Sequence, residues 1–347
     1  MEIAFGILSA KECAGSLRQL VLGLGEEDPV FVHHDFSQQR PFNVADTNAY
    51  LIPDYIETSW GSADLARAIL HLIRIALRRS RFDYFQLLSA SCLPLRPVAD
   101  LRRHLSMGQH AVLADMLNLD IDERVMMSHG HRVFCRAEKL ASRLLSRSRR
   151  WYLGENPVTL QRANLGLHER QDSFAPLTAW QWLGKQMHHA ARAGMLDNHP
   201  FHGTTAPFVG SLWFCLRRDV CEYLLQKEER DPVVVYLMGL KVCDEILFST
   251  LLGNSGFDIQ PSNHLVNEFV GSHPRYFEEG DIPTLAGCDR FFARKFRDDP
   301  GDPTRQSVLA RLRQRTQAGL HDSVVCNELL SKTTSAAPQD IGSNGKS

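Results

Sequence analysis

Two adjacent acids, Asp244 and Glu245, directly precede an apolar run in the segment CDEILFSTLLGNSGF at 243–257. A carboxylate can take the proton from an attacking hydroxyl group, which is general-base catalysis. Acids in the first turn of a helix are also common, because they interact favourably with the helix dipole. The pair alone predicts a helix start and leaves open whether one carboxylate also does chemistry.

A second group of candidates is basic and lies nearer the carboxyl end of the chain. Arg294 and Lys295 stand between Phe292 and Phe296 in RFFARKF, and HPRYF supplies Arg275. The flanking aromatic residues predict a partly buried segment, and a buried cation needs an anionic partner. A diphosphate and an internal carboxylate are the two partners left open, since arginine can contact either with two nitrogens.

Metal chemistry has two weaker candidate sites. Asp120 and Asp122 form a D-x-D pattern in LDIDER, and such carboxylates can chelate a divalent ion. His33, His34 and Asp35 end a predicted strand, but adjacent strand residues point to opposite faces, so the three cannot converge on one ion. Asp35 is instead well placed, at the end of a strand, to bind a ribose or a base edge.

Several common catalytic motifs are missing from the chain. It has no phosphate loop of the G-x-G-x-x-G or G-K-[ST] type, no G-x-S-x-G turn and no H-E-x-x-H. Hydrolase and nucleotide-kinase functions therefore have little support. The eight cysteines form no C-x-x-C pair and the net charge is only −1, so neither a cysteine-based zinc site nor binding to nucleic acid is expected.

The elements that must position these residues alternate between strands and helices. Apolar runs rich in β-branched and aromatic residues predict strands, and apolar residues at helical spacing predict helices. This alternation is typical of an α/β fold with a mostly parallel sheet, whose ligands bind at the carboxyl ends of the strands. The predicted strands cover 2–8, 29–35, 82–90 and 110–117, and the predicted helices cover 10–24, 63–79, 98–105 and much of 234–252.

Seven segments, taken in order, resemble the core-2/I-branching β-1,6-N-acetylglucosaminyltransferase family (glycosyltransferase family 14), which includes the peptide O-xylosyltransferases. Any one match is unspecific, but together they extend over roughly residues 2–297 and end in a nearly identical FARKF. The chain resembles a bacterial-type member. The segments are EIAFGILSA, VFVHHDFS, SWGSADLARAILHLIRIAL, FDYFQLLSASCLPLRP, GSLWFCLRRDVCEYLL, CDEILFSTLLGNSGF and LAGCDRFFARKF.

The resemblance implies a GT-A type fold, with a mixed, mostly parallel sheet flanked by helices. It implies inverting transfer from a UDP-sugar, carrying N-acetylglucosamine or xylose, to a hydroxyl of a glycan or other acceptor. No metal or other cofactor is expected, because basic residues hold the diphosphate in place of an ion. On the matching positions Glu245 is the general base, Trp213 and Asp244 lie on the acceptor side, and the nucleotide-sugar is bound by Asp35, Arg275, Arg294 and Lys295.

The chain departs from the family pattern at two of these motifs. Cys92 stands where the family's SGxD turn has its Asp, which puts the usual contacts of that carboxylate in doubt. Cys243 replaces the proline of the family's PDE motif, so a helix-starting residue is lost while the acid at Glu245 is kept.

The sequence has no internal repeat and no clear linker within 1–326, and its last residues are polar. We expect one catalytic domain over 1–326, with a nucleotide-sugar part at about 1–118, an acceptor and catalytic part at about 119–326, and a disordered polar tail at 327–347. The first residues have no signal-peptide pattern and no apolar stretch is long enough to span a membrane, so a cytoplasmic enzyme is expected. Three alternatives stay open: peripheral membrane contact, a non-catalytic sugar-binding relative, and a metal-dependent transferase using Asp120 and Asp122.

Overall fold

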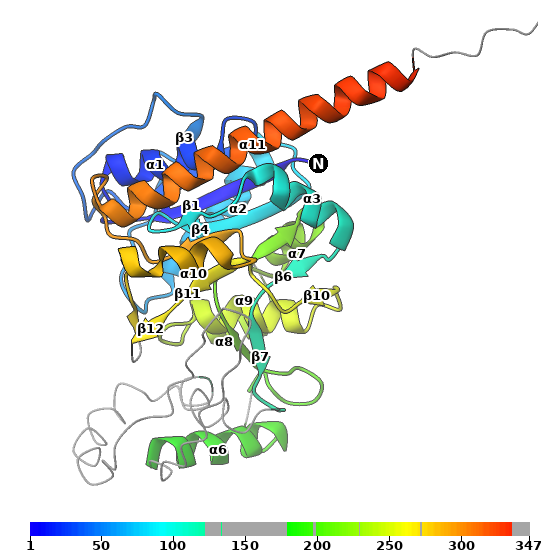
Figure 1. Ribbon diagram of the computed structural model, residues 1–347. Helices are drawn as coiled ribbons and strands as arrows, with labels where there is room; N and C mark the ends of the chain where they lie inside the picture. The colour runs from blue at the N-terminus through cyan, green and yellow to red at the C-terminus, as the bar shows by residue number, and fades with distance from the viewer. Residues whose placement is uncertain (122–132, 134–178, 197–198, 229, 271–272, 335–347) are drawn as a thin grey trace, which may run out of the picture.

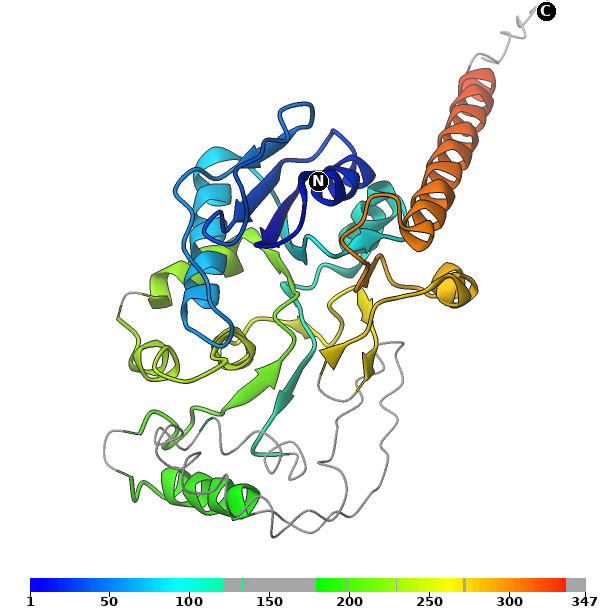
Figure 2. The ribbon, with the colours of Figure 1, turned by 90° about the vertical axis from the view of Figure 1, so that its left-hand side faces the viewer.

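The computed structural model describes residues 1–121, 133, 179–196, 199–228, 230–270 and 273–334, and these form an α/β architecture (Figures 1 and 2). Among them, the main sheet has seven strands in the order β10–β6–β9–β4–β1–β2–β3. Only β9 runs antiparallel to its neighbours in this sheet, so the predicted mixed and mostly parallel sheet is confirmed. The strands are β1 (Ile3–Ser9), β2 (Val30–His34), β3 (Ala49–Leu51), β4 (Tyr84–Ser89), β6 (Val112–Leu113), β9 (Cys215–Arg217) and β10 (Ile259–Gln260).

Helices cover both faces of this sheet because alternate residues of its central strand are apolar on each side. Phe5 and Ile7 of β1 pack in one core with the helices α1 and α3, whereas Ala4 and Leu8 pack in another with α2, α7, α8 and α9. A nearly continuous apolar run, buried on both faces as in β1, is the usual pattern of a strand in a parallel sheet between helical layers. The bounds are α1 (Ala14–Leu24), α2 (Asp64–Arg79), α3 (Val98–Gly108), α7 (Arg218–Glu228), α8 (Pro232–Leu237) and α9 (Asp244–Gly253).

A second, three-stranded sheet brings the basic FARKF segment against the first part of the chain. Its order is β11–β14–β5, and β14 pairs parallel with β11 and antiparallel with β5. A separate apolar core joins this sheet to α10 and α11. The bounds are β5 (Leu93–Pro94), β11 (Leu265–Asn267), β14 (Phe292–Arg294), α10 (Ile282–Gly287), α11 (Pro303–Thr334), the 3-10 helix η2 (Glu279–Asp281) and the hairpin strands β12 (Phe269–Val270) and β13 (His273–Pro274).

The end of α11 corrects the predicted boundary of the polar tail. The helix runs to Thr334, so residues 327–334 are helical although they were expected to be disordered. Glu328, Leu329, Leu330 and Lys332 are good helix formers and continue a helix that has already been nucleated. Figure 1 shows this end of α11 projecting away from the sheets. Within the described ranges every helix, α11 included, is too short or too polar to cross a membrane.

The strand predicted at 110–117 is divided into two short strands. β6 stays in the main sheet, and after Ala114 and Asp115 the chain leaves it as β7 (Met116–Asn118) to pair with β8 (Phe208–Gly210). The backbone of Asp115 accepts a hydrogen bond from Ser211 N at 2.8 Å, which fixes this departure. Beyond β7, the described part of the predicted acceptor region begins with α6 (Ala179–Arg192).

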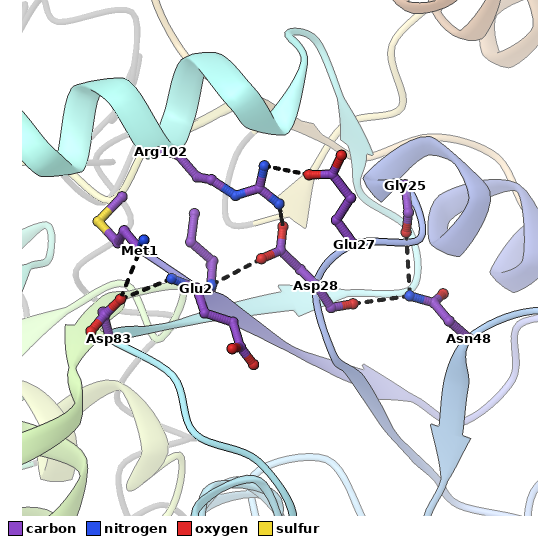
Figure 3. A network of polar contacts seen from close by, with 9 residues as sticks. Met1, Glu2, Gly25, Glu27, Asp28, Asn48, Asp83 and Arg102 are labelled. Carbon is purple, nitrogen blue, oxygen red and sulfur yellow. Dashed lines mark hydrogen bonds and ion pairs between the residues drawn. The ribbon is translucent and has the colours of Figure 1, made fainter.

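A polar network holds the amino ends of β1 and β2, at the opposite end of the sheet from the expected ligand site (Figure 3). The Asp28 carboxylate is buried, accepts a hydrogen bond from Ile3 N at 3.0 Å and pairs with Arg102 of α3. Arg102 also pairs with Glu27 at 2.6 Å, and Asn48 donates to the backbone oxygen of Asp28 at 2.9 Å. This network connects α3 and β3 to the first strand.

Candidate active site

A cleft of about 290 Å³ opens at the carboxyl ends of β1 and β4. These two strands are parallel neighbours, and ligands of open α/β sheets bind at this kind of edge. The turn after β1, the turn after β4 and the segment after β14 together form its walls. The lining residues are Ala10, Lys11, Glu12, Ala90, Ser91, Tyr276, Lys295, Phe296, Asp298 and Arg305.

Lys295 supplies a cation to this cleft. Its ammonium lies 4.9 Å from the ring centroid of Tyr276, and no carboxylate of the described residues is within ion-pair distance of it. Tyr276 is 38% exposed, and its ring also lies 5.3 Å from the guanidinium of Arg297. An aromatic face orients a cation without neutralising it, so Lys295 can still pair with an anion.

Arg294, the residue before Lys295, has a more deeply buried side chain. Its guanidinium lies 5.0 Å from the ring centroid of Trp213, and its Nε is buried with no hydrogen-bond partner among the described residues. Burial lowers the pKa of this guanidinium, against the opposing effect of Cys92 and Glu12. A buried cation without a carboxylate partner is costly, so this position favours an anionic ligand.

Arg275 has a different environment from the other two predicted diphosphate cations. It pairs with both carboxylate oxygens of Asp281, at 2.7 and 2.8 Å, and its Nε donates to Glu268 at 2.6 Å. These two carboxylates raise the pKa of the guanidinium, with the hydrogen bond to Asp281 as the largest cause. Because both carboxylates compensate its charge, the geometry of Arg275 favours a structural role that joins β13 to η2.

Asp35 follows β2, as predicted, and its carboxylate is fully buried. It accepts hydrogen bonds from Ser37, from the Nε2 of Gln38 at 2.7 Å, and from the backbone and hydroxyl of Thr58 at 2.7 and 2.8 Å. These bonds hold the pKa of Asp35 below its usual range, although burial alone would raise it. The carboxylate thus joins the turn after β2 to the segment before α2, and its contact with a nucleoside stays a prediction.

The two acids of the opening motif begin α9, and they differ in exposure. Asp244 is buried at 5% exposure, whereas Glu245 is only half-buried. Helix α9 packs closely on β8 because Gly210 has no side chain: a Cβ there would lie 2.4 Å from the Oγ of Ser249. The division predicted from the sequence, with Asp244 as the structural acid and Glu245 as the accessible one, is consistent with these exposures.

Trp213 connects this helix to the basic pair. It lies between β8, on which α9 packs, and β9 of the main sheet, and its ring is the one beside Arg294. The structure therefore places Trp213 against Arg294, whose neighbour Lys295 lines the cleft, and packs α9, which carries Glu245, on β8. Arg275 is the one predicted diphosphate cation that these contacts do not include.

Cys92 cannot supply the carboxylate that the family has at its position. The thiol is fully buried, and burial raises its pKa to about 12. Its sulfur accepts a weak hydrogen bond from Ser89 N at 3.4 Å. The neighbouring Ser91, which lines the cleft, is the polar side chain that this turn presents instead.

The described side chains of the two candidate metal motifs make hydrogen bonds or ion pairs with other residues of the protein. Asp120 accepts from His188 of α6 at 2.6 Å and pairs with Arg192 at 3.3 Å, while Asp122 lies outside the described residues. His33 accepts a hydrogen bond from Ile56 N at 2.9 Å, and His34 contacts the hydroxyl of Ser9 at 2.8 Å. Among the described residues, no three His, Cys, Asp or Glu side chains gather in the way a metal ion would require.

Several cleft residues escaped the sequence reasoning. The strand-end rule could have indicated Lys11, Glu12 and Ser91, because they follow β1 and β4 directly. No comparable sequence pattern could have indicated Arg305. Its fully buried guanidinium donates to Gln19, Ser16 O and Arg297 O at 2.9, 3.0 and 3.2 Å, and so connects the start of α11 to α1.

The sheet order and the cleft at the strand ends define an open α/β protein. Residues 26–167, less than half of the chain, match the family model of the core-2/I-branching enzymes, a family of GT-A-like glycosyltransferases, and this match supports the predicted resemblance. The match covers β2 to β7, whereas Glu245, Arg294 and Lys295 lie beyond it. No curated protein matches the chain.

Proposed function

We propose that this protein is an inverting, metal-independent glycosyltransferase that moves N-acetylglucosamine or xylose from a UDP-sugar to a hydroxyl acceptor. The family match supports glycosyltransferase activity, and the residue roles are our proposal. The observation that carries it is the pair Arg294–Lys295: two adjacent cations beside a strand-end cleft, neither paired with a carboxylate of the described residues.

The two cations fit the charge that develops as the nucleotide leaves. When the bond between the anomeric carbon and the diphosphate oxygen breaks, UDP departs with the electron pair and gains negative charge. Fixed cations stabilise that charge more in the transition state than in the ground state, which is the condition for rate acceleration. Because Arg294 and Lys295 are already positioned by Trp213 and Tyr276, they need little reorganisation during the reaction.

Glu245 completes the proposed chemistry on the acceptor side. The acceptor oxygen attacks the anomeric carbon from the face opposite UDP, and its proton passes to the Glu245 carboxylate. Inversion needs only this one base, because the leaving group is stabilised by the cations rather than protonated by a second acid. The half-buried position of Glu245 at the start of α9 is compatible with contact to an acceptor.

The alternative, a metal-dependent transferase using Asp120 and Asp122, predicts a different sensitivity to chelators. The pairing of Asp120 with His188 and Arg192 favours a structural role for this carboxylate. We expect EDTA to leave activity almost unchanged. Loss of activity with EDTA, restored by a divalent metal, would favour the D-x-D mechanism.

The donor can be identified by a screen of UDP-sugars for thermal stabilisation and for slow donor hydrolysis. A ligand at 100 times its Kd stabilises the folded state by about 2.7 kcal/mol, which is readily detected as a higher melting temperature. We expect stabilisation by UDP and by either UDP-N-acetylglucosamine or UDP-xylose. Stabilisation by these sugars without hydrolysis or transfer would indicate the non-catalytic binding relative, and no stabilisation by any of them would contradict the proposal.

A further inference from the structure

Trp60 and Lys241 form an exposed pair beside the start of α9. The Trp60 side chain is 82% exposed, and the Lys241 ammonium lies 5.2 Å from the centroid of its ring. Lys241 occupies the turn that leads into α9, four residues before Glu245. Tryptophan carries a large, rigid apolar face, and here that face lies exposed beside a cation, so the two together can contact a ligand.

A tight turn explains why Trp60 points outward. Ser62 N donates to Ser59 O at 3.1 Å, which closes a four-residue turn with Trp60 at its tip. Gly61 follows with φ of 75°, a conformation that glycine adopts without strain. The indole lies on the surface because the local sequence forms a tight turn with Trp60 at its tip.

The turn is also fixed from two sides. Thr58, two residues before Trp60, is held by the buried carboxylate of Asp35. On the other side, Val242 N donates to Gly61 O at 2.9 Å, and a Cβ on Gly61 would lie 3.3 Å from the Cγ of Lys241. The Lys241 stem therefore lies beside Gly61, and the turn that carries Trp60 is joined to the turn that begins α9.

The charge and location of this pair indicate what it binds. No carboxylate of the described residues lies within ion-pair distance of the Lys241 ammonium, which is exposed. Neither residue lines the cleft that we assign to the donor. An aromatic face binds the C–H surface of a sugar ring, and an adjacent unpaired ammonium attracts a carboxylate at close range.

We propose that Trp60 and Lys241 form an acceptor subsite for an acidic sugar unit, with the ring stacked on the indole and its carboxylate paired with Lys241. The inference rests on the proposed function, because it is the place of Lys241 in the turn before α9, the helix that begins with Asp244 and Glu245, that assigns the bound sugar to the acceptor side. It adds the chemical class of the acceptor, which neither the family nor the cleft specifies.

Binding by the full chain, with and without UDP, tests the subsite by titration calorimetry. The probes are a tetrasaccharide of the hyaluronan repeat, which contains glucuronate, and neutral chitotetraose. We expect the acidic probe to bind roughly fivefold more tightly, the upper range for an exposed ion pair, and the difference to shrink in high salt. Equal affinity for the two probes, or binding of neither, would overturn the proposal.

Matched variants separate the two side chains. Lys241→Met keeps the apolar stem and should abolish the preference for the acidic probe. Trp60→Ala should weaken the binding of both probes, whereas Trp60→Phe should retain most of the affinity. Arg78→Ala, which removes an exposed cation at the far end of α2, should change nothing. Preserved preference in Lys241→Met would overturn the role of the lysine.

UDP binding distinguishes failure of this inference from failure of the proposed function. Lys241→Met and Trp60→Ala should bind UDP as the unsubstituted chain does. Loss of UDP affinity in both variants would assign the pair to the donor site and overturn the acceptor subsite. Absence of UDP binding in the unsubstituted chain would instead contradict the proposed function, whatever the oligosaccharides do.

Discussion

Arg294 lies with its guanidinium 5.0 Å from the ring centroid of Trp213, and this contact joins the two sheets at the candidate site. Arg294 ends β14 of the smaller sheet, while Trp213 precedes β9 of the main sheet. An aromatic ring positions the cation but leaves its charge uncompensated. Arg294 therefore resembles the neighbouring Lys295, and differs from Arg275, in having no carboxylate partner among the described residues.

The first prediction concerns which cations hold the nucleotide. Lys295→Ala should weaken UDP binding about 10- to 100-fold, since a hydrogen bond to a charged group contributes about 1.5–3 kcal/mol. Arg275→Ala should leave UDP affinity within about twofold while lowering stability, because its removal leaves Glu268 and Asp281 unpaired. Titration calorimetry and urea unfolding measure the two effects. A large loss of UDP affinity in Arg275→Ala would restore the role predicted from the sequence.

The second prediction concerns the base. Glu245→Gln should retain UDP affinity and lower kcat about 10²- to 10⁴-fold, because the amide cannot accept the acceptor's proton. Glu279→Gln, an exposed acid of η2, serves as the control and should be fully active. Turnover by Glu245→Gln at the normal rate would remove this residue from the mechanism.

The third prediction concerns the network at the amino ends of the strands. Arg102→Ala should lower the free energy of unfolding by about 2–4 kcal/mol, because it leaves the buried Asp28 without its cation. Arg103→Ala, the next residue of α3, removes only an exposed pair with Asp100 and should cost at most about 0.5 kcal/mol. Urea unfolding of the two variants gives the comparison, and equal losses would show that the buried pair contributes nothing specific.

The fourth prediction concerns pH. Burial lowers the pKa of His33 to about 4 and that of His264 to about 3, from an ordinary value of 6.5. As the pH falls below 6.5, these histidines bind protons in the unfolded chain but stay neutral in the folded chain. The free energy of unfolding therefore decreases. Each histidine should account for about 2 kcal/mol of loss between pH 7 and pH 5.

A variant isolates one of these contributions. His264 has φ of 61°, a conformation that asparagine tolerates, and asparagine does not titrate in this range. His264→Asn should therefore reduce the loss between pH 7 and pH 5 by about 2 kcal/mol, as measured by urea unfolding at both pH values. An unchanged loss in the variant would mean that His264 does not control this pH dependence.

The sequence by itself determined the elements and the class of protein. Strands predicted at 2–8 and 29–35 appear as Ile3–Ser9 and Val30–His34, and the helix at 63–79 appears as Asp64–Arg79. Their patterns are local: apolar runs bounded by turn residues, and apolar positions at helical spacing. The order of family motifs likewise needs no coordinates, and the family match over 26–167 supports the three motifs that lie within it.

Only the tertiary structure decided which charged side chains are compensated. The resemblance implies a diphosphate contact for both Arg275 and Arg294, with Arg275 on the more loosely matching loop, but the fold places two carboxylates against Arg275 and an indole against Arg294. It likewise brings His188 and Arg192 to Asp120, far along the chain. Charge compensation depends on contacts between residues distant in sequence, and no local pattern encodes those contacts. The pair of Trp60 and Lys241 is a further example. These residues lie about 180 positions apart in the sequence, and only the fold brings their two loops together.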